Sequence, residues 1–387
     1  MSSKIKVLQV IPKLGYGGAE TGCYDLAHYL AEKDCNSYIV TSGGPLLKFI
    51  RKNKVKVFRL PVHSKNPILM IINAIIISFL IILLNIDIIH VRSRAPAWSC
   101  WIANLITRRK FVTTFHGTYN FKGKIKKFYN SIMLRSDLTI AGSNFIFNHI
   151  NSNYSDLLGT KKKLLVIFRG INTEYYSKSS ISDEKVEKFN SVLKLQNETF
   201  KILLPGRLTK WKGQEMFLAS LSLLKTKYYK TNFKGIILGS HQGRKVYFKK
   251  LLAMVEQYRL KDNVVFLNFC EDMPIAYYSS DVVVSASIEP EAFGRVAVEA
   301  QAMQRPILAS DLGGSKETIV NGKSGILFKN GNPDSLAENL NNIIEMDKDK
   351  LQSIGNEGRK NILIKFDVEK MCQSTFTEYQ KLLKQKK

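Results

Sequence analysis

The chain of 387 residues has few cysteines and prolines, and far fewer acidic than basic side chains. Its five cysteines are odd in number, lie far apart and form no C-x-x-C pair, which argues against a disulfide framework or a structural zinc site. Ten prolines and 24 glycines exclude a collagen-like or proline-rich chain. The opening MSSKIKVLQVIPKLG lacks the apolar core and cleavage site of a signal peptide. We therefore expect a cytoplasmic protein in a reducing compartment.

Negative charge is scarce throughout the chain. The 32 Asp and Glu residues are outnumbered by 58 Lys and Arg residues, which gives a formal net charge of +26. The excess is greatest in residues 51–135, where 16 basic side chains stand against the single Asp87. Such a field attracts nucleic acid, anionic lipid or a phosphorylated substrate, and composition alone does not choose among these partners.

One long hydrophobic run interrupts this basic region. Residues 67–84, PILMIINAIIISFLIILL, reach the length of a membrane-spanning helix. The run contains Asn73 and Ser78, however, and the strand-like segment NIDIIHV follows it at once. A helix packed on a sheet would have a similar sequence. We favour such a packed helix, and the sequence leaves open whether 67–84 is buried in the core or touches lipid.

Short β-branched apolar runs alternate with segments of helical period along the whole chain. Such runs are typical of parallel strands buried on both faces, so they predict an α/β fold with doubly wound parallel sheets. The expected strands are residues 6–11, 37–41, 55–60, 87–91, 111–115, 138–142 and 164–168, followed by 200–206, 234–239, 263–268, 281–287, 306–310 and 325–329.

The two halves of the chain open in the same way. KVLQVIPKLGYGGAE near the start and KILLPGRLTKWKGQEMF after residue 200 each read as a strand, a glycine-bearing turn and a helix. In open α/β sheets, ligands bind beyond the carboxyl ends of the strands, at the point where the strand order reverses. We therefore predict two domains with a ligand site between them, joined by the polar stretch 174–199.

Residues 287–318 hold the densest group of candidate functional residues. Glu291 follows an expected strand, and Glu299 falls inside a helix that we expect to begin near Gly294. The N-terminus of such a helix favours an anion, and two nearby carboxylates suit a phosphorylated sugar with hydroxyls at two places. Two surface glutamates on an amphipathic helix would have the same spacing.

Three further groups follow expected strands. Arg207 and Lys212 could clamp a diphosphate, although solvated cations in a loop would have the same sequence pattern. His116 comes directly after the strand FVTTF, where an imidazole can hydrogen-bond a ligand. Gly17 and Gly18 allow close backbone approach to a ligand, but they form no G-x-G-x-x-G fingerprint. The sequence has no Walker loop, no Ser/His/Asp order and no cluster with metal-ligand spacing.

Taken in this order, the motifs resemble those of the retaining glycosyltransferases of family 4. The matching stretches are GGAE, TTFHGTY, VIFRGINTEYY, GRLTKWKG, SIEPEAFGRVAVEA and GGSKE. The resemblance implies a GT-B fold, in which two Rossmann-like doubly wound parallel-sheet domains face each other across a cleft. It also implies an acceptor domain at 1–176, a nucleotide-sugar domain at 177–365, and a final helix at 366–387 that crosses back to the first domain.

The resemblance also implies roles for the candidate residues of the second half. Glu291 would contact hydroxyls of the transferred sugar, and Glu299 would contact the nucleotide ribose. Arg207 and Lys212 would hold the diphosphate. Backbone groups of Phe293 and Gly294 would also contact the donor.

In the first half, Gly17 or Gly18 would approach the diphosphate, and His116 would touch the sugar near the reacting carbon. Two positions depart from the family pattern. Gln304 stands at a helix end, and Asn268 at a strand end, where relatives commonly have glycine. The second departure leaves the base preference open.

The implied activity is the transfer of a hexosyl-type sugar from a nucleotide-diphosphate sugar to an acceptor hydroxyl, with retention of the anomeric configuration. Neither a metal ion nor a cofactor is expected beyond the donor itself. A nucleotide-sugar epimerase of the same architecture is an alternative, but it lacks the E-x7-E pattern with GRL and KG. A basic nucleic-acid-binding protein is a second alternative; the chain lacks aromatic-studded binding modules, so we expect no nucleic-acid partner.

The basic region suggests where the acceptor is located. In FKGKIKKFYNSIMLRS (121–136), Phe121, Ile125, Phe128 and Ile132 would share one stripe of a helix with lysines beside it. This pattern is typical of a helix at a membrane surface, although a stripe that packs on the sheet would look the same. The family context favours a peripheral enzyme on the inner face of the cytoplasmic membrane, with a glycolipid, lipid-linked glycan or lipopolysaccharide as acceptor.

Overall fold

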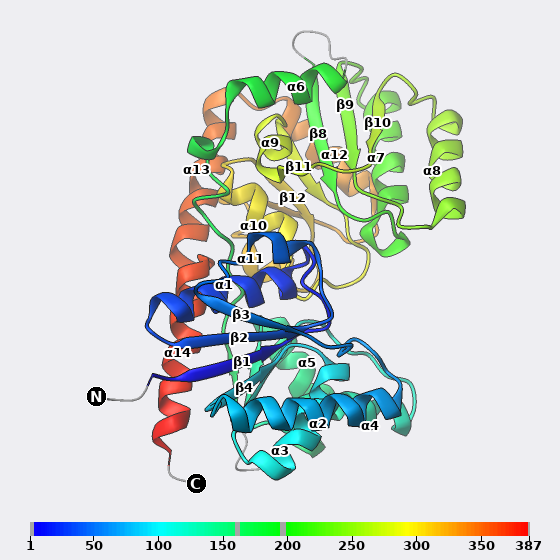
Figure 1. Ribbon diagram of the computed structural model, residues 1–387. Helices are drawn as coiled ribbons and strands as arrows, with labels where there is room; N and C mark the ends of the chain where they lie inside the picture. The colour runs from blue at the N-terminus through cyan, green and yellow to red at the C-terminus, as the bar shows by residue number, and fades with distance from the viewer. Residues whose placement is uncertain (1–3, 159–162, 194–198, 386–387) are drawn as a thin grey trace. The chain divides into compact units, whose positions relative to one another are not determined.

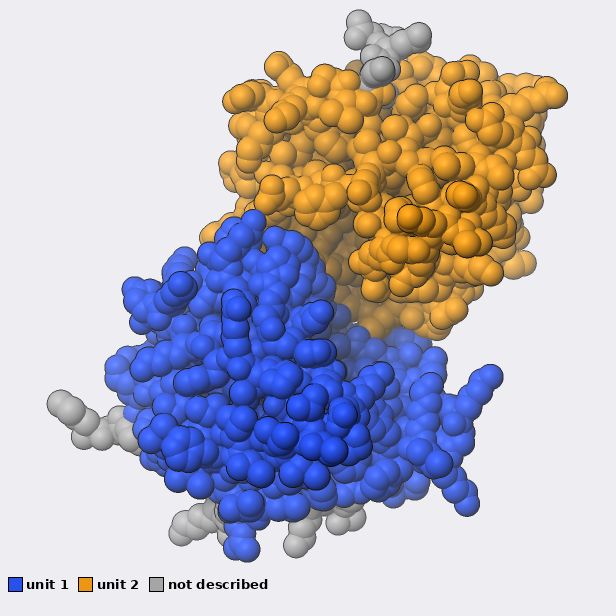
Figure 2. All heavy atoms as spheres, turned by 45° about the vertical axis from the view of Figure 1, so that its right-hand side comes forward, with its two compact units in different colours: residues 1–170, 368–387 blue, residues 171–367 orange. Residues whose placement is uncertain are grey.

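The computed structural model describes residues 4–158, 163–193 and 199–385 of the chain. These residues form two compact units (Figures 1 and 2). Unit 1 comprises residues 1–170 and 368–387, and unit 2 comprises residues 171–367. The first boundary therefore falls before the polar stretch 174–199, whose described part belongs to unit 2 and includes helix α6. Residues 194–198 of that stretch lie outside the described residues.

Unit 1 is built on a seven-stranded sheet in the order β3-β2-β1-β4-β5-β6-β7. Every neighbouring pair is parallel, and the order reverses between β1 and β4, as in a doubly wound fold. All seven strands expected in this half are present. They are β1 Lys6–Val10, β2 Asn36–Thr41, β3 Val55–Arg59, β4 Ile88–Val91, β5 Lys110–Phe115, β6 Leu138–Ala141 and β7 Lys163–Val166.

Helices cover both faces of this sheet. Leu26 and Tyr29 of α1 and Tyr379 of α14 share one buried cluster with strand residues such as Val112. Figure 1 shows α2 and α3 on the opposite side of the sheet from α1. The helices are α1 Gly18–Glu32, α2 Pro67–Leu83, α3 Arg94–Thr107, α4 Lys124–Ser131, α5 Asn144–Tyr154 and α14 Val368–Lys384.

Unit 2 repeats this plan with a six-stranded parallel sheet in the order β10-β9-β8-β11-β12-β13. The order reverses between β8 and β11, and the six expected strands are all present. They are β8 Phe200–Pro205, β9 Phe233–Leu238, β10 Val264–Leu267, β11 Val282–Ser285, β12 Ile307–Ser310 and β13 Ile326–Phe328. The prediction of an α/β protein with two Rossmann-like parallel sheets is confirmed.

The main core of unit 2 lies between its sheet and helices α7, α8 and α12. Phe217, Leu221, Leu251 and Leu340 from these helices pack with strand residues in one buried cluster. The helices of unit 2 are α6 Asp183–Leu193, α7 Gln214–Thr226, α8 Lys245–Gln257, α9 Met273–Tyr278, α10 Arg295–Ala302, α11 Ser315–Thr318, α12 Pro333–Ile344 and α13 Lys348–Lys365.

The long hydrophobic run forms helix α2. The Asn66 side chain accepts hydrogen bonds from the backbone N–H groups of Ile68 and Leu69 and so caps its first turn. The helix packs beside α3 at the side of unit 1. Among the described residues, no helix has both the length and the apolarity needed to span a membrane. The run is not wholly buried either, because one side of α2 is exposed.

The predicted stripe over 121–136 is wrong in two of its four positions. Gly123 adopts a φ of 79°, so the chain turns there and Phe121 lies before helix α4, against Tyr154. The helix ends at Ser131, and Ile132 begins a short 3-10 helix, η2 (Ile132–Leu134), whose side chains are all buried. Only Ile125 and Phe128 remain as exposed apolar residues of this stripe.

Candidate functional site

Two loops meet beyond the carboxyl ends of β8 and β11, where the strand order of unit 2 reverses. The first runs from Gly206 through the short helix η5 (Lys210–Lys212) to Gly213, and the second runs from Ala286 to Gly294. A backbone hydrogen bond of 2.8 Å from Ile288 N to Trp211 O ties the loops together. This is the place where doubly wound sheets bind their ligands.

The closest contact between these loops joins two of the residues singled out in the sequence. Lys212 Nζ lies 2.6 Å from Glu291 Oε1, and only 14% and 11% of the two side chains are exposed. Ser287 Oγ donates to the same carboxylate oxygen at 2.5 Å. Lys212 Nζ also lies 4.4 Å from the centre of the Trp211 ring. A largely buried cation is thus held by a carboxylate and an aromatic face.

Two glycines allow the loops to approach. Gly213 has a φ of 74°, and a Cβ there would lie 1.8 Å from the carbonyl oxygen of Ala286. Gly314 lies under the second loop, where a Cβ would come within 2.6 Å of the Cα of Phe293. Any side chain at either position would push the second loop out of place.

Helix α10 begins where the sequence indicated. Gly294 is its N-cap with a φ of 82°, and Arg295 is its first residue. Phe293 is buried and packs edge-on against Phe366, with ring centres 5.6 Å apart. This anchor fixes the loop that carries Glu291 at the start of the helix.

Glu299 lies further along α10, in a buried polar cluster. Tyr277 Oη donates to Glu299 Oε2 at 2.7 Å, and Arg295 forms an ion pair with Oε1. Burial, followed by the negative charge of Glu299, raises the pKa of both Tyr277 and Tyr176 well above the ordinary tyrosine value. Both hydroxyls therefore remain protonated and able to donate. The structure gives each Glu299 oxygen a protein partner, so the contact to ribose stays a prediction.

Arg207 does not join Lys212 and Glu291. Its side chain is exposed, and it forms no hydrogen bond or ion pair with any described residue. Its backbone carbonyl accepts a hydrogen bond of 3.0 Å from Gln214 Nε2. The guanidinium is therefore accessible at the surface of unit 2.

In unit 1, the glycine turn lies at the N-terminus of α1. Gly17 is the N-cap, and a Cβ there would meet the carboxylate of Glu20 at 2.3 Å. A Cβ on Gly18 would lie 1.8 Å from Nη2 of Arg169, which follows β7. The absence of a side chain at Gly18 therefore makes room for the Arg169 guanidinium.

His116 lines the same small cavity as Gly18 and Arg169. The cavity has a volume of about 20 Å³, enough for one water molecule. Both ring nitrogens of His116 are buried, and neither has a hydrogen-bond partner among the described residues. Burial and the positive charges of Arg169 and Arg92 lower the pKa of His116 well below its usual range. The imidazole is thus neutral and has unused hydrogen-bonding capacity.

Comparison with known proteins assigns both units to one kind of enzyme. Residues 16–175 match the family described as Glycosyltransferase Family 4, and residues 185–361 match the Glycosyl transferases group 1 family. A crystal structure of a glycosyltransferase from Rickettsia africae ESF-5 is 34% identical in sequence. It superposes with a TM-score of 0.90 over 99% of this chain and 100% of that one.

The chain belongs to the family 4 glycosyltransferases.

Other similar proteins share less of the sequence. The capsular polysaccharide biosynthesis glycosyltransferase CapM of Staphylococcus aureus is 28% identical over 229 residues, which is 59% of this glycosyltransferase and 58% of CapM. HepE of Anabaena, solved in complex with UDP and glucose, has the same fold. It is 23% identical, with a TM-score of 0.81 over 97% of this chain and 100% of that one.

Sequence reasoning missed two arginines of this glycosyltransferase. Arg92 is buried after β4 and donates from Nε to Gln9 Oε1 at 3.0 Å, and it shares the cavity of His116 with Arg169. Arg169 lies in the quoted stretch VIFRGINTEYY, and Arg92 directly follows the expected strand at 87–91. The signal available in the sequence was the position of each arginine directly after an apolar strand. In a chain with 58 basic residues, that position alone does not identify a functional arginine.

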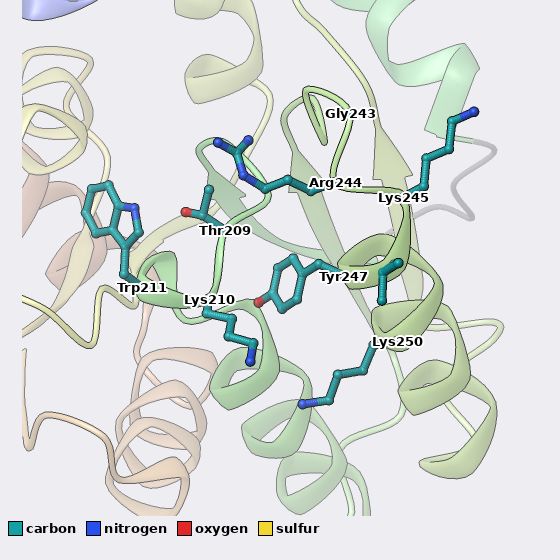
Figure 3. A pocket seen from close by; sticks show the side chains of 9 residues that line it. Thr209, Lys210, Trp211, Gly243, Arg244, Lys245, Tyr247 and Lys250 are labelled. Carbon is teal, nitrogen blue, oxygen red and sulfur yellow. The ribbon is translucent and has the colours of Figure 1, made fainter.

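A basic pocket of about 680 Å³ lies next to the Lys212 loop and was also not foreseen. Figure 3 shows Thr209, Lys210 and Trp211 on one side and the residues from Gly243 to Lys250 on the other. Its cations are Lys210, Arg244, Lys245 and Lys250. Lys250 is paired with Glu215 at 2.5 Å, and Tyr247 Oη donates to Gln214 at 3.2 Å. The pocket adds positive charge beside Lys212.

Within the described ranges, no group of three or more His, Cys, Asp and Glu side chains is arranged to hold a metal ion. The groups near Glu291 are a lysine and a serine hydroxyl, and those near His116 are arginines. The cations at these two places are therefore Lys212, paired with the Glu291 carboxylate, and Arg92 and Arg169 beside His116.

Proposed function

We propose that this glycosyltransferase moves a hexosyl unit from a nucleotide-diphosphate sugar to a hydroxyl of a lipid-linked or lipopolysaccharide-type acceptor, with retention of configuration and without a metal ion. The observation that carries the proposal is the Lys212–Glu291 pair at the strand-order reversal of unit 2. The complexes of HepE with UDP and UDP-glucose support a nucleotide-sugar donor.

In the proposed reaction, the bond between the anomeric carbon and the β-phosphate oxygen breaks while a bond to the acceptor oxygen forms on the same face. The acceptor proton passes to the leaving diphosphate oxygen. Lys212, together with Arg207, balances the negative charge that grows on the diphosphate. Because Ser287 holds the Glu291 carboxylate and that carboxylate holds the Lys212 ammonium, little reorganisation is needed when the charge on the diphosphate develops.

Glu291 acts here by position, not as a covalent nucleophile. One of its carboxylate oxygens accepts from Lys212 and Ser287, so the carboxylate is fixed and can also accept hydrogen bonds from sugar hydroxyls. Glu299 would contact the ribose, and backbone groups of Phe293 and Gly294 would contact the donor. In unit 1, Gly17 or Gly18 would approach the diphosphate, and neutral His116 would hydrogen-bond the sugar.

We place the enzyme at the inner face of the cytoplasmic membrane, because the basic region 51–135 belongs wholly to unit 1 and favours an anionic surface. This placement brings the enzyme to an acceptor that is itself embedded in lipid.

The test uses a panel of sugar nucleotides with extracted envelope lipids as acceptors. We expect release of free nucleoside diphosphate with one donor class, together with a glycosylated lipid whose anomeric signals in NMR spectra match the configuration of the donor. Inverted product would contradict the retaining reaction. Conversion of the donor to its epimer without transfer to the lipid would favour the epimerase alternative instead.

A further inference from the structure

Helix α2 presents an apolar outer face to solvent. Eight large apolar side chains of this helix leave between 37% and 69% of their surface exposed. They recur at intervals of three and four residues, so they lie on one side of the helix. At 1.5 Å per residue, this α2 face is about 22 Å long. It consists of Ile68, Ile71, Ile72, Ile75, Ile76, Phe79, Ile82 and Leu83.

The polarity of α2 is the reverse of that expected for a helix in water. Its two polar residues, Asn73 and Ser78, are on the buried side. Asn73 Nδ2 donates to Pro61 O at 3.3 Å, and Ser78 Oγ donates to Ala74 O at 2.8 Å. The α2 face itself has no charged or polar side chain. Because a surface helix normally turns its apolar residues inward, this face indicates apolar surroundings outside the protein.

Neighbouring helices extend the exposed apolar surface. Leu105 and Ile106 are exposed at the end of α3, which packs beside α2. Ile125 and Phe128 are exposed on α4, and the Phe128 ring lies 5.4 Å from that of Trp98 in α3. The three helices therefore form one side of unit 1.

Cations accompany these apolar residues. Arg108 follows Ile106 at the end of α3, and lysines surround Ile125 in α4. Asp87 is the single acidic residue of the region 51–135, and its carboxylate is engaged by the backbone N–H of Lys6 at 2.8 Å. This one carboxylate stands against 16 basic side chains, so the region as a whole attracts an anionic surface. The exposed cations at the end of α3 and around the start of α4 are Arg108, Lys122, Lys124 and Lys126.

We propose that the α2 face inserts among the acyl chains of an anionic bilayer, with the flanking cations at the level of the lipid headgroups. This inference rests on the membrane docking of the proposed function and makes α2, in place of the 121–136 stripe, the main apolar contact. A bilayer accepts a row of isoleucines without any shape match or polar partner. A second copy of the chain would bring two regions of charge +15 together, which disfavours self-association through this face.

The experiment is flotation of the full chain with phosphatidylglycerol vesicles and with phosphatidylcholine vesicles. The test variant is Ile75→Glu/Phe79→Glu, and the matched control is Val192→Glu/Leu252→Glu, which places the same charges on exposed apolar positions of α6 and α8. Because all four side chains are exposed, we expect all variants to keep the circular dichroism and thermal midpoint of the wild type.

We expect the wild type and the control to float with phosphatidylglycerol vesicles, and the α2 variant to bind at least ~10-fold more weakly. High ionic strength should weaken binding of the wild type without abolishing it, because salt screens the cations and not the apolar face. A fluorophore on Ile82→Cys should also be quenched by spin-labelled acyl chains.

Three results would overturn the inference. If the α2 variant floats like the wild type, the cations alone dock the enzyme, so the proposed membrane location stands and α2 insertion fails. If the wild type binds neither kind of vesicle, α2 insertion and the proposed membrane location both fail, and the proposed sugar transfer is unaffected. If sedimentation reveals a dimer that the α2 variant separates, without vesicle binding, the face is an interface between copies of the chain.

Discussion

Lys212 and Glu291, which are 79 residues apart in the chain, form an ion pair of 2.6 Å across the two loops that end β8 and β11. Neither loop alone creates this arrangement. Because Gly213 has no side chain, the first loop can pack against the carbonyl group of Ala286. Because Gly314 has none, the second loop can pack at Phe293 against the start of α11. The parallel pairing of β8 with β11 then brings the two side chains to the same edge of the sheet.

Replacing either partner should disable turnover. We expect Lys212→Ala and Glu291→Ala each to lower kcat/KM by at least ~100-fold, the scale of losing one preorganised transition-state contact. Steady-state kinetics on the donor identified by the panel measure this loss. Lys188→Ala, at an exposed position of α6, is the matched control and should retain wild-type kinetics. Near-normal turnover in a folded Lys212 or Glu291 variant would remove the pair from the reaction.

The Gly18–Arg169 contact predicts a non-additive pair of substitutions. A Cβ at Gly18 would displace the Arg169 guanidinium, so Gly18→Ala should reduce kcat/KM while the thermal midpoint changes little. In an Arg169→Ala background, the same change should cost no further activity. Additive losses would show that Gly18 acts independently of Arg169, for example by direct approach to the donor.

The burial of His116 predicts that the folded chain loses stability at acidic pH. Burial and the charges of Arg169 and Arg92 lower the pKa of His116 in the folded chain. The unfolded chain therefore takes up a proton below about pH 6.5 that the folded chain resists, and stability is lost as pH falls. Thermal midpoints at about pH 7.5 and about pH 5.5 should differ less for His116→Asn than for the wild type. His63→Asn, on the surface, is the control; an identical difference in wild type and His116→Asn would contradict the assignment.

Gln304 marks a position where the chain is less stable than it could be. It follows the end of α10 with a φ of 55°, a left-handed conformation that favours glycine. Gln304→Gly should raise the thermal midpoint by about 2 °C, which corresponds to roughly 0.5–1 kcal/mol. Gln304→Ala keeps the Cβ and should give no gain. Equal midpoints for the two variants would show that the left-handed backbone carries no strain here.

The sequence was sufficient to predict the sheets but not the surroundings of every helix. Runs such as VKVFRL and DVVVSAS are too short and too β-branched for helices, and each became a parallel strand. The run 67–84 is apolar apart from Asn73 and Ser78, and polar side chains of a surface helix normally face solvent, so the pattern did not indicate which side would face the protein. Only the structure reveals that Asn73 and Ser78 lie inward and the isoleucines outward.

The sequence predicted the positions of some site residues better than those of others. Glu291 and Lys212 follow strands and lie shortly before Gly294 and Gly213, so the sequence pattern could place them beyond the strand ends, and the structure brings them together. Arg207 lies even closer to the end of its strand, yet its side chain is exposed to solvent. Arg92 was overlooked because only the cavity that it shares with His116 distinguishes it from the other cations.

Release of nucleoside diphosphate from the sugar nucleotide, followed in EDTA with acceptor present, is the decisive test of the proposed metal-independent transfer at Lys212 and Glu291. We expect EDTA to leave the rate unchanged, because Lys212 and Arg207 supply the positive charge at the diphosphate, and we expect Glu291→Gln to abolish most of the release. Release that requires added Mg²⁺ or Mn²⁺, or that continues at the wild-type rate in Glu291→Gln, would contradict this proposal.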